Sequence, residues 1–374
     1  MLKSLFVRIC GFFMTLIYAC AKLAPVKKGK VLFLSRQSNE PSLDFTMLQR
    51  ELSSRQQVTQ VVMICQRVKK SFGGALAVTK AMVRSIVHLA TCEVCIIDSY
   101  WPAVSMLHHR DSLTVLQIWH ALGKVKQSGL VTAGRPGGRS ATLAKAVHMH
   151  EGYDYIVAGA PTWNRFYCES FGCGEEKLLN LGLPRMDYIR DCASEIKERF
   201  HAAYPRMEGR PVVVYAPTFR RDAEGHVVTV DVSELEDPSY ELIVKSHPNQ
   251  LLDAHGVETC PDFTTVDLLA VADVLITDYS AMALEAAWAH VRTLYYLYDC
   301  DEYVARNGLN VNPRDEMPSC SYATAPEVVS AVKGALEGDY PQADFEAYRA
   351  KWLLPGDSHP TRDIADFVCG KLGR

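Results

Sequence analysis

The stretch Asp267-Leu-Leu-Ala-Val-Ala-Asp-Val-Leu-Ile-Thr-Asp-Tyr-Ser-Ala281 carries the clearest fold signal in the chain. Its apolar run, 274–276, predicts a strand that is buried on both faces, as the strands of parallel sheets are. The polar residues 277–280 follow, and a helical stretch begins at about 281. Ser280 suits an N-cap position, because its hydroxyl can accept from amides of the first helical turn. Open α/β sheets bind ligands at such strand ends, so the pattern predicts a phosphate-bearing ligand, such as a nucleotide diphosphate.

Strand-like and helix-like patterns alternate along the rest of the chain. Runs that predict strands in the first half are 31–35, 60–64, 92–97, 115–119, 155–158 and 178–181. A second series comprises 212–215, 241–245, a weaker run at 263–266, 274–276 and 293–296. Helical patterns are found at 42–53, 75–90, 161–170, 326–336, 343–352 and 361–372. This alternation predicts an α/β protein with mainly parallel sheets.

Length and composition indicate a folded protein of two domains. The chain has 374 residues, more than one typical domain, and Pro and Gly residues punctuate the region 184–211. We therefore expect an N-terminal Rossmann-like domain over 29–190 and a C-terminal one over 191–374, facing a central cleft. The last helix could return to the N-terminal domain. Apolar residues make up 48% and the net charge is −3, so nucleic acid is not an expected partner.

The twelve cysteines lack the spacing of a disulfide scaffold. Cys92 and Cys95 form a single CxxC inside a predicted strand, and no second pair of metal-ligand spacing accompanies it. A structural role for both thiols is favoured, and a zinc or redox pair is the alternative. Reduced cysteines in a cytosolic compartment fit this pattern.

Residues 1–28 form an apolar segment with a basic flank. The uninterrupted apolar part, 9–21, is shorter than the ~20 residues needed to span a bilayer. Lysines follow at positions 22, 27, 28 and 30. A membrane-surface helix is the favoured interpretation, and a spanning helix or a cleaved signal peptide are the alternatives.

Four further motifs also lie at predicted strand ends. They are 117–129 with His120, Gly182-Leu-Pro-Arg-Met-Asp187, Tyr215-Ala-Pro-Thr-Phe-Arg220 and Val244-Lys-Ser-His-Pro248. Each alone is a weak signal, since a histidine at a strand end is more often structural than catalytic. Together with 277–281 they give five loops that could converge on one crevice.

The order and spacing of these motifs resemble the CDP-glycerol glycerophosphotransferase family of teichoic-acid synthesis. The resemblance covers about 115–303 and includes the sequence Asp299-Cys-Asp-Glu-Tyr303. It implies a GT-B-type fold and the transfer of a polyol phosphate from a CDP-polyol, releasing CMP. Glycerol phosphate is the favoured group and ribitol phosphate the alternative. The implied acceptor is a hydroxyl of a lipid-linked glycan or poly(polyol phosphate), at the cytoplasmic face of the cell membrane.

The resemblance also implies roles for individual residues. His120 corresponds to the proposed general base, and His247 to a second essential histidine that contacts the diphosphate. The expected donor-binding residues are Ala121, Leu122, Gly123, Lys124, Arg185, Pro217, Thr218, Arg220, Lys245, Ser246, Thr277, Asp278, Ser280, Ala281 and Glu285. The basic members of this set would offset the diphosphate charge.

Three positions depart from the family pattern. Ala121 replaces a glycine, Ala281 replaces a second serine, and Glu285 replaces an aspartate. These changes leave the identity of the transferred polyol open.

Asp278 is the one acid in the diphosphate loop and is expected to cap the amides of that loop. No cofactor is predicted, and a need for a divalent cation stays open. A GT-B glycosyltransferase or epimerase, and a non-catalytic glycan-binding or nucleotide-binding homologue, are the alternative functions; homo-oligomers are possible.

Overall fold

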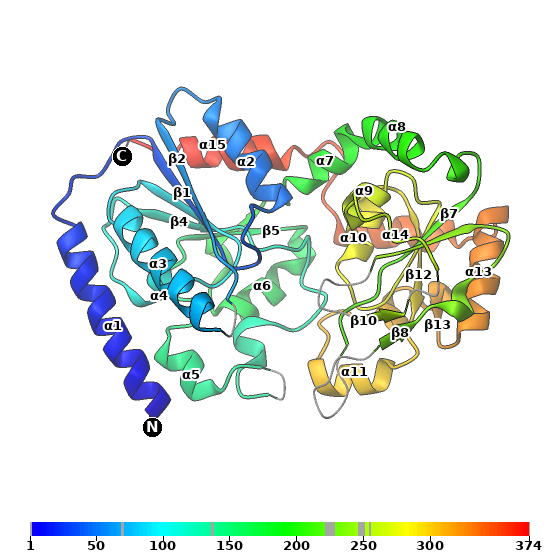
Figure 1. Ribbon diagram of the computed structural model, residues 1–374, viewed down its shortest axis with the longest axis horizontal. Coiled ribbons are helices and arrows are strands. Elements are labelled where there is room, and N and C mark those ends of the chain that lie inside the picture. Colours follow the sequence, from blue (N-terminus) through cyan, green and yellow to red (C-terminus); the bar gives the residue numbers. More distant parts are fainter. Residues whose placement is uncertain are drawn as a thin grey trace. The chain divides into compact units, whose positions relative to one another are not determined.

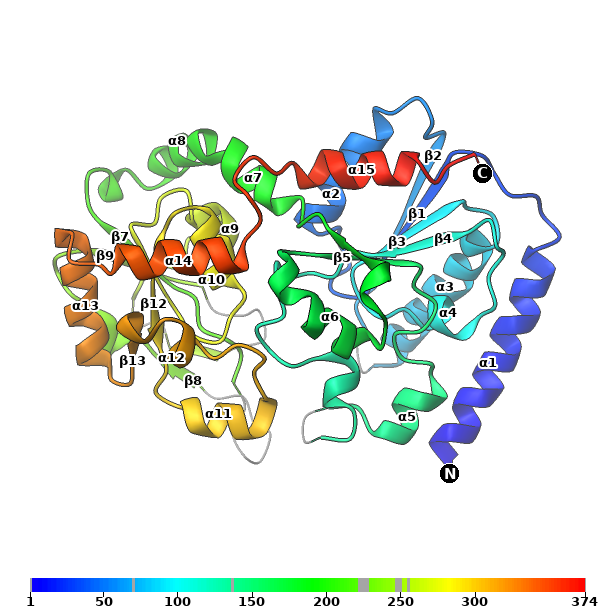
Figure 2. The ribbon, with the colours of Figure 1, turned by 180° about the vertical axis from the view of Figure 1, so that it is seen from behind.

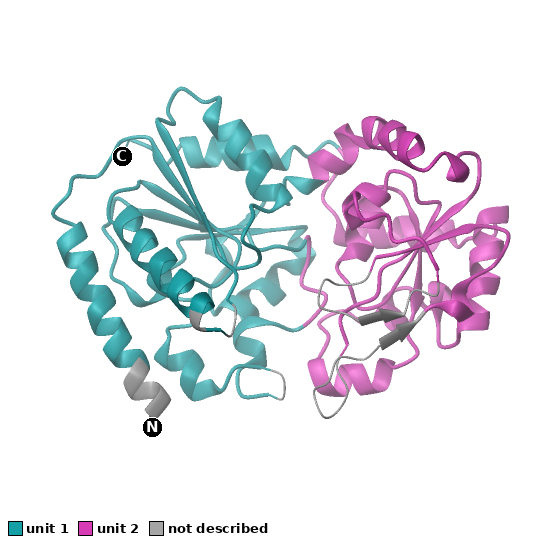
Figure 3. Cartoon of the chain, in the orientation of Figure 1, with its two compact units in different colours: residues 1–121, 127–185, 357–374 teal, residues 122–126, 186–356 magenta. Residues whose placement is uncertain are grey.

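The computed structural model describes residues 2–68, 71–135, 138–220, 229–245, 251–253 and 256–373 (Figure 1). The chain divides into two compact units (Figure 3). Unit 1 comprises residues 1–121, 127–185 and 357–374, and unit 2 comprises 122–126 and 186–356. The division after 185 differs from the expected one after 190. The reason is that Trp288 Nε1 donates to Met186 O at 2.8 Å and Tyr188 donates to Asp267 Oδ1 at 2.6 Å, so this turn packs on unit 2.

The described part of unit 1 contains a six-stranded parallel sheet of order β2-β1-β3-β4-β5-β6. Its strands are β1 (Lys30–Ser35), β2 (Gln60–Cys65), β3 (Val94–Ile97), β4 (Thr114–Gln117), β5 (Tyr155–Ala158) and β6 (Leu178–Asn180). The run Val31–Leu34 is fully buried in the interior strand β1, between β2 and β3, which explains its unbroken apolar sequence. Because all six strands run the same way, their carboxyl ends lie at one edge.

Helices cover this sheet (Figures 1 and 2). They are α1 (Leu2–Ala21), α2 (Leu43–Ser53), α3 (Phe72–Leu89), α4 (Pro102–Met106), α5 (Ala141–Ala146), α6 (Asn164–Phe171) and α15 (Pro360–Cys369). Helix α2 begins after Ser42, whose hydroxyl accepts from Phe45 N. Helix α15 lies beside α2 although more than 300 residues separate them, and Arg55 pairs with Asp366 at 2.9 Å.

The described part of unit 2 contains a five-stranded parallel sheet of order β13-β12-β11-β7-β9 and a parallel pair, β8 and β10. The strands are β7 (Val212–Tyr215), β8 (Thr229–Asp231), β9 (Glu241–Val244), β10 (Leu251–Asp253), β11 (Val274–Thr277), β12 (Arg292–Tyr296) and β13 (Ser321–Tyr322). The helices are α7 (Arg185–Asp191), α8 (Ala193–Ala203), α9 (Thr265–Leu268), α10 (Met282–Trp288), α11 (Cys300–Asn307), α12 (Pro313–Glu316), α13 (Ala325–Glu337) and α14 (Gln342–Trp352). The predicted α/β class with two parallel sheets is confirmed.

One predicted strand is wrong. The weak run at 263–266 overlaps the short helix α9. A capping box explains the difference, because the Thr264 hydroxyl accepts from Asp267 N while the Asp267 carboxylate accepts from Thr264 N. This reciprocal pair fixes a helix start where the apolar pattern alone is ambiguous.

The amino-terminal segment forms the helix α1, which packs against α3 and α5. Within the described ranges, no helix is both long enough and apolar enough to span a membrane. The basic flank is smaller than expected, since Lys30 is buried in β1 and donates to Thr91 Oγ1 at 2.6 Å. Lys22 is also engaged, donating to His108 O at 2.6 Å. Lys27 and Lys28 remain exposed.

Candidate active site

His120 lies three residues beyond the carboxyl end of β4. The turn that carries it is made by Trp119, which has a left-handed φ of 59°. Such a conformation costs a non-glycine residue about 1–2 kcal/mol. Two contacts hold it: Trp119 N donates to Gln117 Oε1 at 2.8 Å, and the indole ring packs edge-on to Phe171 at 5.3 Å. The imidazole of His120 lies 4.0 Å from the same indole, centre to centre.

The surroundings of His120 favour one tautomer. Its Nδ1 lies 3.0 Å from the main-chain carbonyl of Asp98, and a carbonyl can only accept. The Gln37 side-chain amide also lies 3.0 Å from Nδ1, with its nitrogen facing the ring. One nitrogen cannot donate to Asp98 and accept from Gln37 at once. An amide can exchange its oxygen and nitrogen by rotating, whereas the carbonyl cannot, so we assign the proton to Nδ1 and the lone pair to Nε2.

Asp98 follows β3 and is almost completely buried. Ser35 donates to its Oδ2 at 2.8 Å, while Oδ1 is buried and makes no hydrogen bond to the described residues. Burial raises the pKa of Asp98 from 3.8 to about 6; the nearby Asp44 charge adds to this, and bonds from Ser35 and Ser99 oppose it. A carboxyl that titrates near neutrality therefore lies directly behind the His120 loop.

Arg185, an expected donor-binding cation, is held by a carboxylate of its own unit. The Arg185 main-chain N–H donates to Asp44 Oδ1 at 2.9 Å, and Nε donates to Asp44 Oδ2 at 3.0 Å. Asp44 lies in the first turn of α2 and is 1% exposed. This pair joins the loop after β6 to α2, so part of the charge of Arg185 is already compensated.

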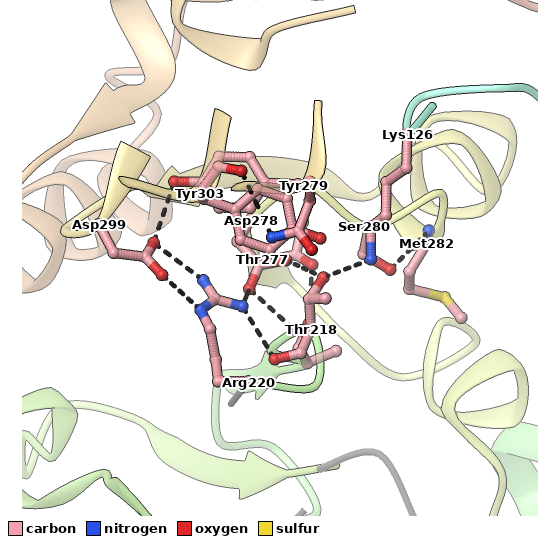
Figure 4. A network of polar contacts seen from close by, with 12 residues as sticks. Lys126, Thr218, Arg220, Thr277, Asp278, Tyr279, Ser280, Met282, Asp299 and Tyr303 are labelled. Atoms are coloured by element: carbon pink, nitrogen blue, oxygen red, sulfur yellow. Dashed lines mark hydrogen bonds and ion pairs between the residues drawn. The ribbon is translucent and has the colours of Figure 1, made fainter. Parts of the chain in front are cut away.

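Arg220 is the centre of a buried polar network at the carboxyl edge of the unit 2 sheet (Figure 4). Its Nη1 donates to Asp278 Oδ2 at 2.8 Å, and its Nε donates to Asp299 Oδ2 at 2.7 Å. The guanidinium also lies 5.2–5.4 Å from the ring centres of Tyr279 and Tyr303. The network therefore links the loops that follow β7, β11 and β12.

Thr218 and Asp278 bind each other within this network. Asp278 was expected to cap amides of its own loop, but its Oδ2 accepts from Thr218 N, in the loop after β7, at 2.7 Å. The Thr218 hydroxyl donates to Asp278 Oδ1 and accepts from Lys126 Nζ, which lies 3.0 Å away. Lys126 thus reaches the strand-end loops of unit 2.

The segment Leu122–Lys126 belongs to unit 2 although both its flanks belong to unit 1. Asn310 fastens it: its main-chain N–H donates to Val125 O at 2.8 Å and its side chain donates to Lys124 O at 2.7 Å. Gly123 and Lys124 are buried, and burial lowers the pKa of Lys124 well below 10.5. Ala121 is the last residue of this stretch in unit 1.

The start of the helix after β11 differs slightly from the expected one, in which Ser280 is the N-cap residue. Helix α10 starts at Met282, so Ala281 occupies the cap position and contributes no side-chain bond. The Ser280 hydroxyl nevertheless accepts from Met282 N at 3.2 Å. Thr277 is buried and donates to Ala216 O at 2.8 Å.

The remaining expected donor-binding residues are spread over unit 2. Pro217 is buried at the end of β7, and Glu285 is 1% exposed inside α10. Lys245 donates to the main-chain carbonyls of Thr259 and Cys260, each at 2.9 Å. Ser246 and His247 lie outside the described residues.

Sequence reasoning missed the carboxylates that hold the basic residues. Asp44, Asp98 and Asp299 are buried or half-buried partners, and Lys126 is a cation of the network. A partial signal existed for Asp98 and Lys126, since each follows a predicted strand within a few residues. No local pattern pairs Asp44 with Arg185, because 141 residues separate them.

Comparison with known proteins places these motifs in a family context. A family model described as CDP-Glycerol:Poly(glycerophosphate) glycerophosphotransferase matches residues 16–370. The chain is 27% identical over 387 residues to the teichoic acid ribitol-phosphate primase of Bacillus spizizenii, covering 99% of this chain and 99% of the relative. It is 23% identical over 299 residues to the teichoic acid glycerol-phosphate primase of Bacillus subtilis, covering 77% and 76%.

A solved structure of the wall teichoic acid polymerase TagF is also similar. It matches with a TM-score of 0.72 at 15% sequence identity, covering 98% of this chain and 97% of the other. At this identity the likeness shows a shared fold.

The buried Asp98 carboxyl predicts a pH-dependent stability. Between pH 3.8 and about 6 the folded protein holds a proton on Asp98 that the unfolded chain releases, so the free energy of unfolding falls as pH rises through this window. The fall amounts to about 3 kcal/mol. Asp98→Asn removes this titration, and its unfolding free energy should decline less between these pH values. The exposed Asp111→Asn control should follow the wild type. Superimposable pH curves for Asp98→Asn and the wild type would contradict the assignment.

The Arg220 network predicts a large loss of stability on removal of its cation. Arg220→Met leaves Asp278 and Asp299 without their shared partner and should cost about 3–5 kcal/mol in unfolding free energy. Arg206 offers a matched control, since its own side chain is 59% exposed in its ion pairs with Glu241 and Glu258. Arg206→Met should cost less than about 1 kcal/mol. Equal losses in chemical denaturation would show that burial of the Arg220 pairs contributes nothing.

Proposed function

The chain belongs to the CDP-glycerol:poly(glycerophosphate) glycerophosphotransferase family, and from this premise we propose that it transfers a polyol phosphate from a CDP-polyol to a hydroxyl of a lipid-linked teichoic-acid acceptor. The observation that carries the proposal is the match over 16–370, which includes nearly all of both units. CDP-polyol transfer in teichoic-acid synthesis is the family's reaction. The acceptor, the polyol and the number of units added are the finer claims that experiment must decide.

The contacts of His120 support its assignment as the general base. A proton held on Nδ1 by the Asp98 carbonyl places the lone pair on Nε2, the atom that would take the proton of the acceptor hydroxyl. The hydroxyl oxygen then attacks the phosphorus that carries the polyol. A new P–O bond forms, the bond from that phosphorus to the bridging oxygen breaks, and CMP leaves with the electron pair. His247, by resemblance, would support the charge on the departing CMP.

The donor is expected at the carboxyl edge of the unit 2 sheet. Parallel sheets bind ligands at this edge, and the polar loops after β7 and β11 meet there. The packing of Arg220 between Asp278 and Asp299 suggests that this arginine shapes the loops rather than carrying the donor charge alone. Ser280, which is partly exposed, offers a hydroxyl close to that edge.

The relatives leave two polyols as candidates. One that spans the whole chain is named a ribitol-phosphate primase, and another is named a glycerol-phosphate primase. Ala121, Ala281 and Glu285 do not discriminate between them. Both donors therefore belong in the first assay.

We further propose that α1 attaches the protein to the cytoplasmic face of the membrane. Its outer face carries the exposed side chains Ile9, Phe12, Phe13 and Leu16, while Tyr18 on the opposite face is buried. These four side chains are 48–67% exposed. An exposed apolar helix face followed by basic residues is suited to an anionic lipid surface, because the rings enter the headgroup region and the lysines approach the phosphates.

The neighbouring helix α3 has a similar composition. Leu76, Val83 and Val87 are exposed on it, and Lys80 and Arg84 lie next to that row. Because α3 packs against α1, both helices can contribute to one lipid-binding region. A lipid-linked acceptor would be concentrated at the same surface.

Removal of the His120 imidazole tests the reaction. CMP release from CDP-glycerol and CDP-ribitol should depend on a lipid-linked disaccharide acceptor, and His120→Ala should lower kcat by roughly 10²–10⁴-fold without changing the unfolding transition. The exposed His108→Ala variant should retain wild-type turnover. A folded His120→Ala protein with near-normal transfer would overturn the base assignment, and saturable donor binding without CMP release by the wild type would favour the binding-only alternative.

Removal of aromatic rings from α1 tests the membrane proposal. The double variant Phe12→Ser/Phe13→Ser should reduce co-sedimentation with phosphatidylglycerol vesicles by roughly tenfold or more, because two exposed rings lose their apolar contact with lipid. Turnover of a water-soluble acceptor analogue should stay unchanged. Val304→Ser, at an exposed apolar position of α11, should sediment like the wild type. Unaltered vesicle binding by the double variant would place the attachment elsewhere.

A further inference from the structure

The basic residues expected to hold the donor diphosphate are already engaged. Arg185 is paired with Asp44, and Arg220 lies between two carboxylates. The Lys245 ammonium donates to two main-chain carbonyls. The two arginines could contact a donor only while sharing their carboxylates, so their net charge toward a phosphate is reduced. Lys245 keeps its charge but could contact a donor only by giving up a carbonyl bond.

Lys126 has a different environment. Its Nζ donates to a neutral group, the Thr218 hydroxyl, at 3.0 Å (Figure 4). Among the described residues, Asp278 is the acid whose charge acts on Lys126, and the Asp278 oxygens accept from Thr218 and Arg220. The ring of Tyr303 lies 5.9 Å from the ammonium. Lys126 as a whole is half-buried.

The main chain holds Lys126 in place. Lys126 forms an antiparallel bridge with Leu309, and Val125 O accepts from Asn310 N at 2.8 Å. These contacts fix the end of the segment 122–126 within unit 2. The lysine is thereby set against Thr218, in the loop directly after β7, at the sheet edge where an anionic ligand is expected.

We propose that Lys126 is the cation that binds the diphosphate of the CDP-polyol, and that the Thr218 hydroxyl orients its ammonium for this contact. The inference rests on the proposed function and deepens it by naming a residue of the 117–129 motif that is not among the donor-binding residues implied by the resemblance. When the bond from the transferred phosphorus to the bridging oxygen breaks, the departing CMP gains negative charge. A fixed ammonium stabilises that charge more than the charge of the bound donor, which favours the transition state.

The titration of Lys126 supports this role. Burial lowers its pKa from 10.5 to about 8; the Arg220 charge acts in the same direction, and the Asp278 charge opposes it. The other ionisable groups near it among the described residues are Tyr303 and, beyond Arg220, Asp299, Tyr279 and Tyr298. The ammonium is therefore charged below about pH 8 and loses its proton above it. Capture of the donor should weaken as pH rises through that value.

The test compares Lys126→Met and Lys126→Arg with the wild type in kcat/KM for the CDP-polyol from about pH 6 to pH 9.5. Lys126→Met should lower kcat/KM roughly 10–100-fold at neutral pH, because a charge-assisted hydrogen bond to phosphate is lost. The alkaline decline near pH 8 should vanish with it. Lys126→Arg keeps its charge at all these pH values, so it should retain more activity and move the decline upward.

Equilibrium binding separates a phosphate contact from a general effect on the fold. Lys126→Met should weaken binding of CMP and of the CDP-polyol in calorimetry but leave cytidine binding unchanged. Lys333→Met, at an exposed lysine of α13, is the matched control and should bind all three ligands like the wild type. Denaturation curves identify any variant that does not fold. If Lys126→Met does not fold, the pH profile of Lys126→Arg tests the proposal.

Two outcomes would overturn the proposal. One is an equal loss of cytidine and CMP binding in Lys126→Met, and the other is an alkaline decline that stays near pH 8 in Lys126→Arg. A wild-type protein that binds CMP through Lys126 but releases none from either CDP-polyol would instead refute the proposed function and leave the phosphate-binding assignment intact.

Discussion

The pairing of Arg220 with Asp278 and Asp299 is the constraint on which the polar edge of unit 2 depends. Arg220 is 7% exposed, and a guanidinium so deeply buried must have its charge balanced nearby. The two carboxylates come from loops after different strands, so the balance also fixes those loops relative to one another. Thr218 is then placed by its bonds to Asp278, and Lys126 by its bond to Thr218. Removing Arg220 would leave the Asp278 and Asp299 carboxylates without their shared cation.

In unit 1 as well, buried aspartates hold the loops at the strand ends. Arg185 is held by the buried Asp44, and the His120 loop rests on the main chain of Asp98. In both units a polar strand end is positioned by a carboxylate that is distant in sequence. The basic residues of the two motif loops are therefore structural groups as well as candidates for ligand contact. This dual use explains why arginines at these positions cannot be counted simply as charge available to a phosphate.

The sequence was sufficient to predict the sheets and the loops at the strand ends. It did not predict which side chains bind one another in those loops. Apolar runs such as 155–158 and 212–215 coincide with β5 and β7, because strands buried on both faces have an unambiguous signal. The run 263–266 was misread, since a capping box outweighed a weak apolar pattern. Lys30 looked like a surface charge because nothing local reveals that it is buried in β1 beside Thr91. The roles of the site residues stay predictions, and Ser246 and His247 lie outside the described residues.

The return of α15 to unit 1 has a consequence for biosynthesis. Ile364, Ala365 and Val368 are fully buried in the finished protein, on a helix that packs against α2. During translation α2 is made early and α15 last, with all of 186–356 between them. At roughly 5–20 residues per second, the ribosome needs ~10–30 s for that interval. The nascent first unit therefore exposes an apolar helix face for this time, until α15 is made.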